Sequence, residues 1–185
     1  DLRIEDLIGR DIVPADAALL VRKVRGRSIL VSGAGGSIGS ELCRQILESL
    51  PSVLVLFELN EFALYRLFSE LEARCASNTD RFEHVKVVPI LGSCQNKDRV
   101  SEIMRIWRPS VIYHTAAYKH VPLVEDNVIE GIANNIFGTF AMVQAAVENK
   151  ASDFVLISTD KAVRPTSVMG ATKRFAEIIL QAKGE

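Results

Sequence analysis

Apolar residues recur along the chain in two alternating patterns, short unbroken runs and longer stretches with helical spacing. The short runs are rich in β-branched residues, which is typical of strands buried on both faces of a parallel sheet. They predict strands at 28–32, 53–57, 85–91, 110–114 and 153–158. The longer stretches predict helices at 37–50, 61–76, 96–107 and 124–149, and a fifth from about Ser167 to Lys183.

This alternation predicts an α/β fold, a doubly wound parallel sheet of the Rossmann type with right-handed crossovers. The first part of the chain differs from the rest. It is charged, contains Gly9, Pro14 and Gly26, and shows one short helical pattern at 15–24. We therefore interpret residues 1–27 as a connecting arm and residues 28–185 as the Rossmann domain.

Composition narrows the classes of protein that fit. With 185 residues, 48% of them apolar, the chain suits one domain with a sizeable core. Its net charge of -1 favours neither nucleic acid nor an anionic membrane surface as a partner. Cys43, Cys75 and Cys94 lack paired spacing, which disfavours disulfides and structural zinc and suits the reducing cytoplasm. The sequence contains no long apolar span and no leader pattern, so it predicts neither a membrane helix nor a signal peptide.

A glycine-rich turn follows the first predicted strand and opens the first predicted helix. Gly33, Gly36 and Gly39 form a Gly-x-x-Gly-x-x-Gly pattern, with Ser37 and Ile38 inside it. Glycine permits positive φ and close backbone approach, and a helix amino terminus offers free N–H groups to a pyrophosphate. The turn therefore predicts dinucleotide binding by these five residues, with a purely structural turn as the alternative.

The second predicted strand runs into Glu58, whose carboxylate can accept hydrogen bonds from the adenosine ribose hydroxyls. An anion at this place repels a 2′-phosphate, so Glu58 favours NAD as the cofactor. NADP remains an alternative because Arg66, further along the following helix, could compensate the charge. The alternative interpretation is that Glu58 is a solvated acid at a strand end and has no part in binding.

The fourth predicted strand is followed by Ala116, Ala117 and Tyr118, which we assign to cofactor binding. Small alanines at the carboxyl end of a strand let a flat cofactor lie close to the backbone. Asn134 and Asn135 in the next predicted helix lower helix propensity. Either a polar role beneath the cofactor or an ordinary buried hydrogen bond would explain them.

No metal site is expected. His114 and His120 are six positions apart, which fits no common ligand spacing on one element. No cysteine or carboxylate pattern completes a site around them.

The run from Ser158 through Thr159, Asp160 and Lys161 lies at the carboxyl end of the fifth predicted strand, the edge where open α/β sheets bind ligands. Together with the glycine turn, the His-x-Ala-Ala-x-Lys-His stretch and the Asn-x-x-Gly element, it resembles the UDP-N-acetylglucosamine 4,6-dehydratases of polysaccharide and protein-glycan biosynthesis. These belong to the extended short-chain dehydrogenase/reductases. Residues 7–11 (Leu-Ile-Gly-Arg-Asp) resemble the segment before the catalytic domain in the larger, membrane-anchored members.

The resemblance implies a Tyr-x-x-x-Lys pair, and the matching positions hold Met169 and Lys173. A thioether has no proton to exchange, so Met169 is neither an acid nor a base. This departure disfavours an ordinary alcohol dehydrogenase. The large branch of the dehydratases is similar, with Met at this place and a Thr-Asp-Lys triplet for the proton chemistry. A further departure is Ser93 after Gly92, where such enzymes often have an adenine-contacting Asp.

The mechanism implied by the resemblance is an internal redox cycle on a UDP-sugar. NAD takes hydride from carbon 4, water leaves across carbons 5 and 6, and hydride returns to carbon 6. Lys161 would remove the carbon 5 proton, Asp160 would protonate the departing hydroxyl, Thr159 would assist at carbon 4, and Lys173 would bind the nicotinamide ribose beside Met169. We assign substrate binding to Lys119, His120 and Asn135.

The resemblance further favours UDP-N-acetylglucosamine as substrate, retained configuration at carbon 5, and a cytoplasmic location at the face of the inner membrane. It allows a homo-oligomer. It also implies that the sequence stops before the lobe that holds the sugar, so that this fragment alone is inactive. The alternatives are a nucleotide-sugar epimerase or oxidoreductase and a non-catalytic NAD-binding regulatory module.

The acid–base pair sets a requirement for the fold. A useful acid at neutral pH needs an Asp pKa about three units above the usual ~3.9, and a Lys base needs a comparable fall from ~10.4. Direct pairing shifts both pKa values the wrong way. We therefore expect Asp160 and Lys161 to point apart or to lie in a strongly desolvated pocket, with a surface turn before Pro165 as the alternative.

Overall fold

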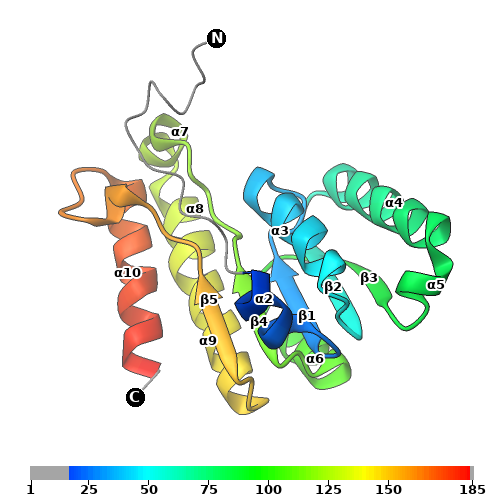
Figure 1. Ribbon diagram of the computed structural model, residues 1–185. Coiled ribbons are helices and arrows are strands. Elements are labelled where there is room, and N and C mark those ends of the chain that lie inside the picture. Colours follow the sequence, from blue (N-terminus) through cyan, green and yellow to red (C-terminus); the bar gives the residue numbers. More distant parts are fainter. Residues whose placement is uncertain (1–16, 184–185) are drawn as a thin grey trace, which may run out of the picture.

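The structure, a computed structural model, describes residues 17–183 and has one parallel sheet at its centre (Figure 1). The strand order is β3-β2-β1-β4-β5, and every neighbouring pair is parallel. This confirms the predicted doubly wound fold. The strands are β1 (Ser28–Ser32), β2 (Val53–Glu58), β3 (Lys86–Leu91), β4 (Val111–His114) and β5 (Asp153–Leu156).

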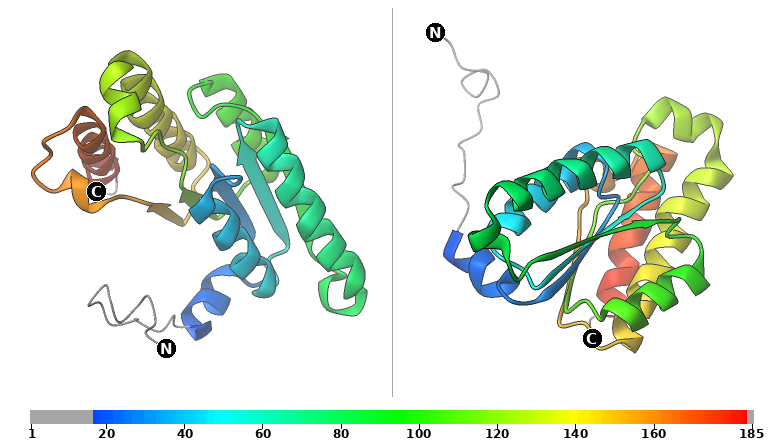
Figure 2. Two further views of the ribbon diagram at one scale, coloured as in Figure 1. Left: turned by 90° about the horizontal axis from the view of Figure 1, so that it is seen from above. Right: turned by 90° about the vertical axis from the view of Figure 1, so that its right-hand side faces the viewer.

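Helices cover both faces of the sheet (Figure 2). One face carries α2 (Ala17–Val24), α3 (Ser37–Glu48), α4 (Glu61–Ser77) and the short α5 (Thr79–Phe82). The other face carries α6 (Lys97–Trp107) and α9 (Gly138–Glu148), with α10 (Val168–Lys183) packed beside α9. The remaining elements are α7 (Val121–Asp126), α8 (Val128–Ile132), the π turn η1 (Ala133–Phe137) and the 3-10 turn η2 (Asp160–Ala162).

The interior positions of the central strands β1 and β2 are apolar because both of their faces are buried. In β1, Ile29 and Val31 join the core beneath α3 and α4, whereas Leu30 joins the core beneath α6 and α9. In β2, Leu56 and Phe57 divide between the two cores in the same way. The unbroken apolar runs in the sequence therefore reflect a sheet sandwiched between two helical layers.

The helix predicted over 124–149 is wrong, because four elements occupy this region. Asn127 separates α7 from α8 with non-helical backbone angles. The π turn η1 then shifts the helical register before α9 begins. Within η1 the side chain of Asn135 bonds to Tyr118 and Thr172, which are distant in sequence. Tertiary hydrogen bonds, rather than local propensity, fix this break.

The described part of the arm is docked on the domain. Val24 at the end of α2 is fully buried in the core beneath α3. Asp153 at the start of β5 forms ion pairs with Lys23 at 2.6 Å and with Arg27 at 3.6 Å. These contacts join the first helix to the strand that leads to residues 158–161. Residues 1–16, including the 7–11 segment, lie outside the described residues.

The glycine turn between β1 and α3 has the geometry that the motif predicts. Gly33 has a φ of 68°, in the left-handed region, and a Cβ there would lie 2.6 Å from the backbone N of Ala116. A Cβ on Gly39 would overlap the carbonyl oxygen of Gly33. Both glycines therefore allow α3 to begin directly against the carboxyl ends of β1 and β4.

Replacing Gly39 by Ala should destabilise the fold although the residue is helical, where Gly→Ala normally gains up to about 1 kcal/mol. The added methyl must displace the turn, at a cost of about 1–3 kcal/mol. The matched control is Gly138→Ala in α9, where the nearest atom to a new Cβ lies 3.4 Å away. Urea unfolding of both variants provides the measurement. Equal or greater stability of Gly39→Ala would contradict the close approach.

A buried polar chain crosses from β1 through β4 to η1 and α9. His114 Nδ1 lies 2.6 Å from Ser32 Oγ, and its Nε2 lies 3.0 Å from Thr139 Oγ1. The Thr139 hydroxyl donates to the Asn135 carbonyl oxygen at 2.7 Å. Nε2 must therefore carry the proton, and Nδ1 accepts from Ser32. Burial, followed by the nearby Lys173 ammonium, lowers the pKa of His114 to about 3.

Lowering the pH should destabilise the protein through His114. Between pH 7 and 5 the unfolded chain binds a proton at this residue and the folded chain does not. The free energy of unfolding therefore falls by about 2 kcal/mol from this group, given an unfolded pKa of ~6.5. His114→Gln should remove this component of the pH dependence, and His84→Gln at an exposed position should keep it. Urea unfolding at pH 7, 6 and 5 measures both, and an unchanged slope in His114→Gln would refute the assignment.

Candidate functional site

A cleft of about 330 Å³ opens at the carboxyl ends of β1 and β2. The glycine turn forms one wall, and the segment after β4 forms the opposite wall. The cleft contains predicted cofactor residues from three elements, namely Gly33, Gly36, Glu58, Ala116, Ala117 and Tyr118. The structure thus brings together residues that lie far apart in the sequence, at the carboxyl edge of the sheet where such folds bind dinucleotides.

Glu58 stands at the end of β2 and braces the glycine turn. Its Oε2 accepts the amide of Gly35 at 2.9 Å, and its Oε1 accepts the amides of Leu59 and Asn60. A carboxylate has about four acceptor positions, so one remains for a ribose hydroxyl. Arg66, the residue that could neutralise it, instead lies over the ring of Phe62 and forms no ion pair with Glu58.

A second cleft of about 270 Å³ lies between α3, the end of β5 and α10. It adjoins the first cleft through Thr115 and Ala117, which line both. Its lining holds four of the five predicted catalytic residues, Thr159, Lys161, Met169 and Lys173, together with Ile38. The continuity of the two clefts gives one elongated site along the carboxyl edge of the sheet.

Lys173 and Met169 enter this second cleft from the first turns of α10. Met169 is buried, and Lys173 is only 6% exposed. The Lys173 ammonium donates to the carbonyl oxygen of Ile157 at 2.7 Å. Burial lowers the pKa of Lys173, and the nearby Glu177 carboxylate opposes that shift. A partly desolvated ammonium is therefore held at the end of β5.

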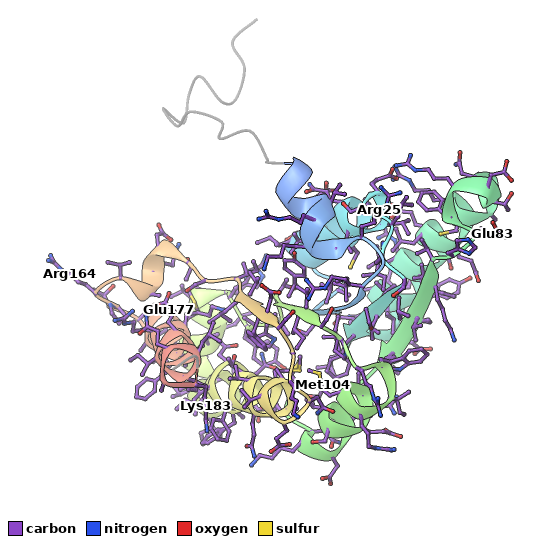
Figure 3. All side chains as sticks on the ribbon, turned by 60° about the horizontal axis from the view of Figure 1, so that its bottom comes forward. Arg25, Glu83, Met104, Arg164, Glu177 and Lys183 are labelled. Carbon is purple, nitrogen blue, oxygen red and sulfur yellow. The ribbon has the colours of Figure 1, made fainter. Side chains whose placement is uncertain are left out.

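Asp160 and Lys161 differ from the expectation that they point apart or lie in a desolvated pocket. Asp160 Oδ1 lies 3.6 Å from Lys161 Nζ, and the two side chains are 80% and 55% exposed. The Thr159 hydroxyl, followed by the Lys161 ammonium, lowers the pKa of the Asp160 carboxyl below its usual value. The structure therefore shows a solvated pair on η2, with Asp160 as a carboxylate rather than an acid. The following loop projects outward, with Arg164 at its tip (Figure 3).

Sequence reasoning missed Glu177, which fastens the end of β5 to α10 from one helical turn beyond Lys173. Its carboxylate accepts the Ser158 hydroxyl at 2.5 Å and the Arg174 guanidinium at 2.8 Å. These bonds lower the pKa of Glu177. Two consecutive residues, Ile157 and Ser158, are thus held by two side chains of one helix. The i, i+4 spacing of Lys173 and Glu177 was the available signal.

Asn135, predicted to bind substrate, has its amide committed within the protein. It is 1% exposed. Its oxygen accepts the Tyr118 amide at 2.8 Å, and its nitrogen donates to the Tyr118 carbonyl at 2.9 Å and to Thr172 Oγ1 at 3.0 Å. Of the two interpretations of the asparagine pair, these contacts match the buried hydrogen bond. Asn135 positions the segment after β4 against α10.

Lys119 and His120 line a third cleft of about 400 Å³ beside Tyr118, at the surface of α7 and α8. Both residues are exposed. Lys119 also lines the second cleft, and its ammonium lies 3.3 Å from the hydroxyl of Ser37. These two predicted substrate residues therefore lie at the outer rim of the site.

Within residues 17–183, no three metal-ligating side chains gather at one point. Over the same described region, no helix is long and apolar enough to cross a membrane.

Comparisons with known proteins extend these observations. The chain is 45% identical over 184 residues to the capsular polysaccharide biosynthesis protein CapD of Staphylococcus aureus, covering 100% of this chain and 30% of that protein. It is 32% identical over 158 residues to an inverting UDP-N-acetylglucosamine 4,6-dehydratase of Campylobacter jejuni, covering 85% and 43%. Among solved structures, the dTDP-glucose 4,6-dehydratase DesIV of Streptomyces venezuelae, determined with NAD bound, shares the fold at a TM-score of 0.69 and 21% identity over 83% of this chain and 50% of that one.

The chain thus spans less than half of the length of these two curated relatives. The sequence profile of the family described as "Polysaccharide biosynthesis protein" matches residues 29–185, which include both adjoining clefts and all five strands apart from Ser28 of β1. The chain therefore belongs to the polysaccharide biosynthesis protein family.

Proposed function

We propose that this chain is the NAD-binding part of a nucleotide-sugar 4,6-dehydratase that converts UDP-N-acetylglucosamine to a UDP-4-keto-6-deoxy sugar. The observation that carries the proposal is the second cleft. There Thr159, Lys161 and Lys173 line the same cleft as Met169, next to the dinucleotide cleft. Among the described residues that line it, no tyrosine supplies the phenol of an ordinary dehydrogenase.

The residues of the first cleft fit NAD. The Gly33 turn and the start of α3 suit a pyrophosphate, and Glu58 suits an unphosphorylated adenosine ribose. Arg66 lies over the ring of Phe62, and among the described residues that line this cleft there is no cation beside Glu58 to favour NADP. NAD held by these residues would supply the hydride acceptor for carbon 4 of the sugar and the hydride donor for carbon 6.

The chain's own side chains would move the protons. Lys161 removes the proton at carbon 5, which the carbon 4 ketone acidifies. Asp160 gives a proton to the departing carbon 6 hydroxyl, which leaves as water. The Thr159 hydroxyl, which donates to the Asp160 carboxylate at 2.9 Å, would relay the carbon 4 hydroxyl proton to Asp160, the proton that Asp160 then gives at carbon 6. Lys161 would return its proton to carbon 5 as hydride reaches carbon 6, and Lys173 binds the nicotinamide ribose. Met169 contributes an apolar wall and exchanges no proton.

Because Asp160 and Lys161 are a solvated pair, binding of the sugar must change the pKa values of both side chains before they can act as acid and base. Closing water out of the cleft raises the pKa of a carboxyl group and lowers that of an amine, which suits both assigned roles. Because the two side chains are exposed, a bound sugar would provide this burial. Lys119 and His120 at the outer rim would bind the substrate, and Asn135 would act by holding Tyr118.

We place the whole protein in the cytoplasm at the inner face of the membrane. The resemblance of residues 7–11 to the segment before the catalytic domain in membrane-anchored members supports this location. That segment lies outside the described residues.

The proposal is tested by incubating the full-length protein with UDP-N-acetylglucosamine and NAD and following the sugar by NMR. A 4-keto-6-deoxy product is expected. The double variant Asp160→Asn, Lys161→Met should lower kcat by at least about a thousandfold, since it removes two general acid–base groups. The matched control is Lys97→Met, Asp98→Asn, an exposed pair at the start of α6, which should retain activity.

Three other results would contradict the proposal. A product epimerised at carbon 4 would show that the protein is an epimerase and not a dehydratase. Unchanged sugar despite bound NAD would favour a regulatory module. Full activity in the Asp160, Lys161 variant would overturn the assigned acid–base pair.

In the ligand-free protein, Asp160 should titrate below the ~3.9 that is usual for Asp. Lys161→Met should raise this pKa because the ammonium contributes to the depression, and the Thr159 hydrogen bond should keep part of it. Carboxyl-carbon NMR over pH 2–6 measures both values. An Asp160 pKa at or above the usual value in the wild type, or no change in Lys161→Met, would contradict the observed pairing.

A further inference from the structure

The far end of the first cleft is built from uncharged groups. The sheet order places β3 beyond β2, so a dinucleotide with its ribose at Glu58 directs its base toward the residues that follow β3. Ser93 and Cys94 line the cleft there, with Asn134 of η1. Among the described residues that line this cleft, Glu58 is the one charged group, and it is committed at the ribose end.

Two side chains at this end combine donor and acceptor capacity. Ser93 Oγ accepts the Gln95 amide at 3.2 Å, and within residues 17–183 it donates no hydrogen bond. The Asn134 amide is buried. Its nitrogen donates to Asn135 Oδ1 at 3.1 Å, and its oxygen lies 3.5 Å from Gln95 Nε2. A hydroxyl and a carboxamide each retain the ability to donate and to accept.

This chemistry bears on which purine the cleft selects. Adenine presents an amine at carbon 6 and an acceptor at N1, whereas a 6-oxopurine presents a carbonyl at carbon 6 and a donor at N1. A carboxylate can only accept, so it pairs with the amine and repels the carbonyl. Ser93 and Asn134 can meet either pattern by rotating a hydroxyl or using the other end of an amide.

We propose that Ser93 sets the base specificity of the dinucleotide cleft, and that the cleft takes a 6-oxopurine dinucleotide nearly as well as NAD. This inference rests on the proposed NAD site and deepens it. Ser93 is a specificity residue at the base and takes no part in the hydride chemistry.

The test uses the full-length protein freed of bound nucleotide. Isothermal titration gives the Kd for NAD and for nicotinamide hypoxanthine dinucleotide. The wild type should bind the two within about threefold of one another. Ser93→Asp should favour NAD by about tenfold or more, because its carboxylate accepts from the amine and faces the hypoxanthine carbonyl. Ser93→Asn, similar in size but able to donate and accept, should keep the wild-type ratio.

The wild-type ratio alone tests the inference, whatever the folding of the variants. Discrimination against the hypoxanthine dinucleotide by more than about thirtyfold in the wild type would overturn it. An unchanged ratio in a folded Ser93→Asp variant, with its melting curve intact, would overturn it as well. Failure of the wild type to bind either dinucleotide would instead reject the NAD site, and the inference with it.

Discussion

The site depends on the hydrogen bonds made by the buried side-chain amide of Asn135. It holds both backbone polar groups of Tyr118 and the hydroxyl of Thr172, so it connects the segment after β4 with α10. Thr172 in turn donates to the carbonyl of Met169. The backbone carbonyl of Asn135 accepts a hydrogen bond from the Thr139 hydroxyl, and Thr139 in turn contacts His114. An unpaired buried amide costs about 1–3 kcal/mol. Loss of these hydrogen bonds would therefore release Tyr118, which lines the first cleft, from α10, which lines the second.

Around this connection, the ends of the strands and the starts of the helices position the two clefts. The glycine turn brings α3 against Ala116 for the nucleotide, while Lys173 and Glu177 hold Ile157 and Ser158 at the end of β5. The nucleotide end is thus bounded largely by the glycine turn and the segment after β4. The reacting end is open, with Asp160 and Lys161 in solvent. Under the proposed function, such a division would let one half receive the cofactor while the other half gains its acid–base character when a sugar excludes water.

The sequence predicted the parts of the fold that depend on burial and local chemistry. All five strands were predicted because apolar runs buried on two faces leave a clear pattern, and the glycine turn was predicted because Gly33 requires positive φ. The breaks at Asn127 and in η1 were missed, because they depend on contacts between Asn135, Tyr118 and Thr172 across the fold. The exposed pairing of Asp160 with Lys161 matches the surface turn that the sequence left as the alternative. The sequence did not decide between the two interpretations, because side-chain direction and exposure in a turn are set by its surroundings.

Transfer of a label within one sugar tests the central claim most directly. The full-length protein is incubated with UDP-N-acetylglucosamine that carries deuterium at carbon 4, and the product is examined by NMR and mass spectrometry. The dehydratase assignment predicts that the deuterium is found at carbon 6 of the 4-keto-6-deoxy sugar, delivered within the same molecule. Deuterium returned to carbon 4 of an intact or epimerised sugar, with no loss of water, would contradict it.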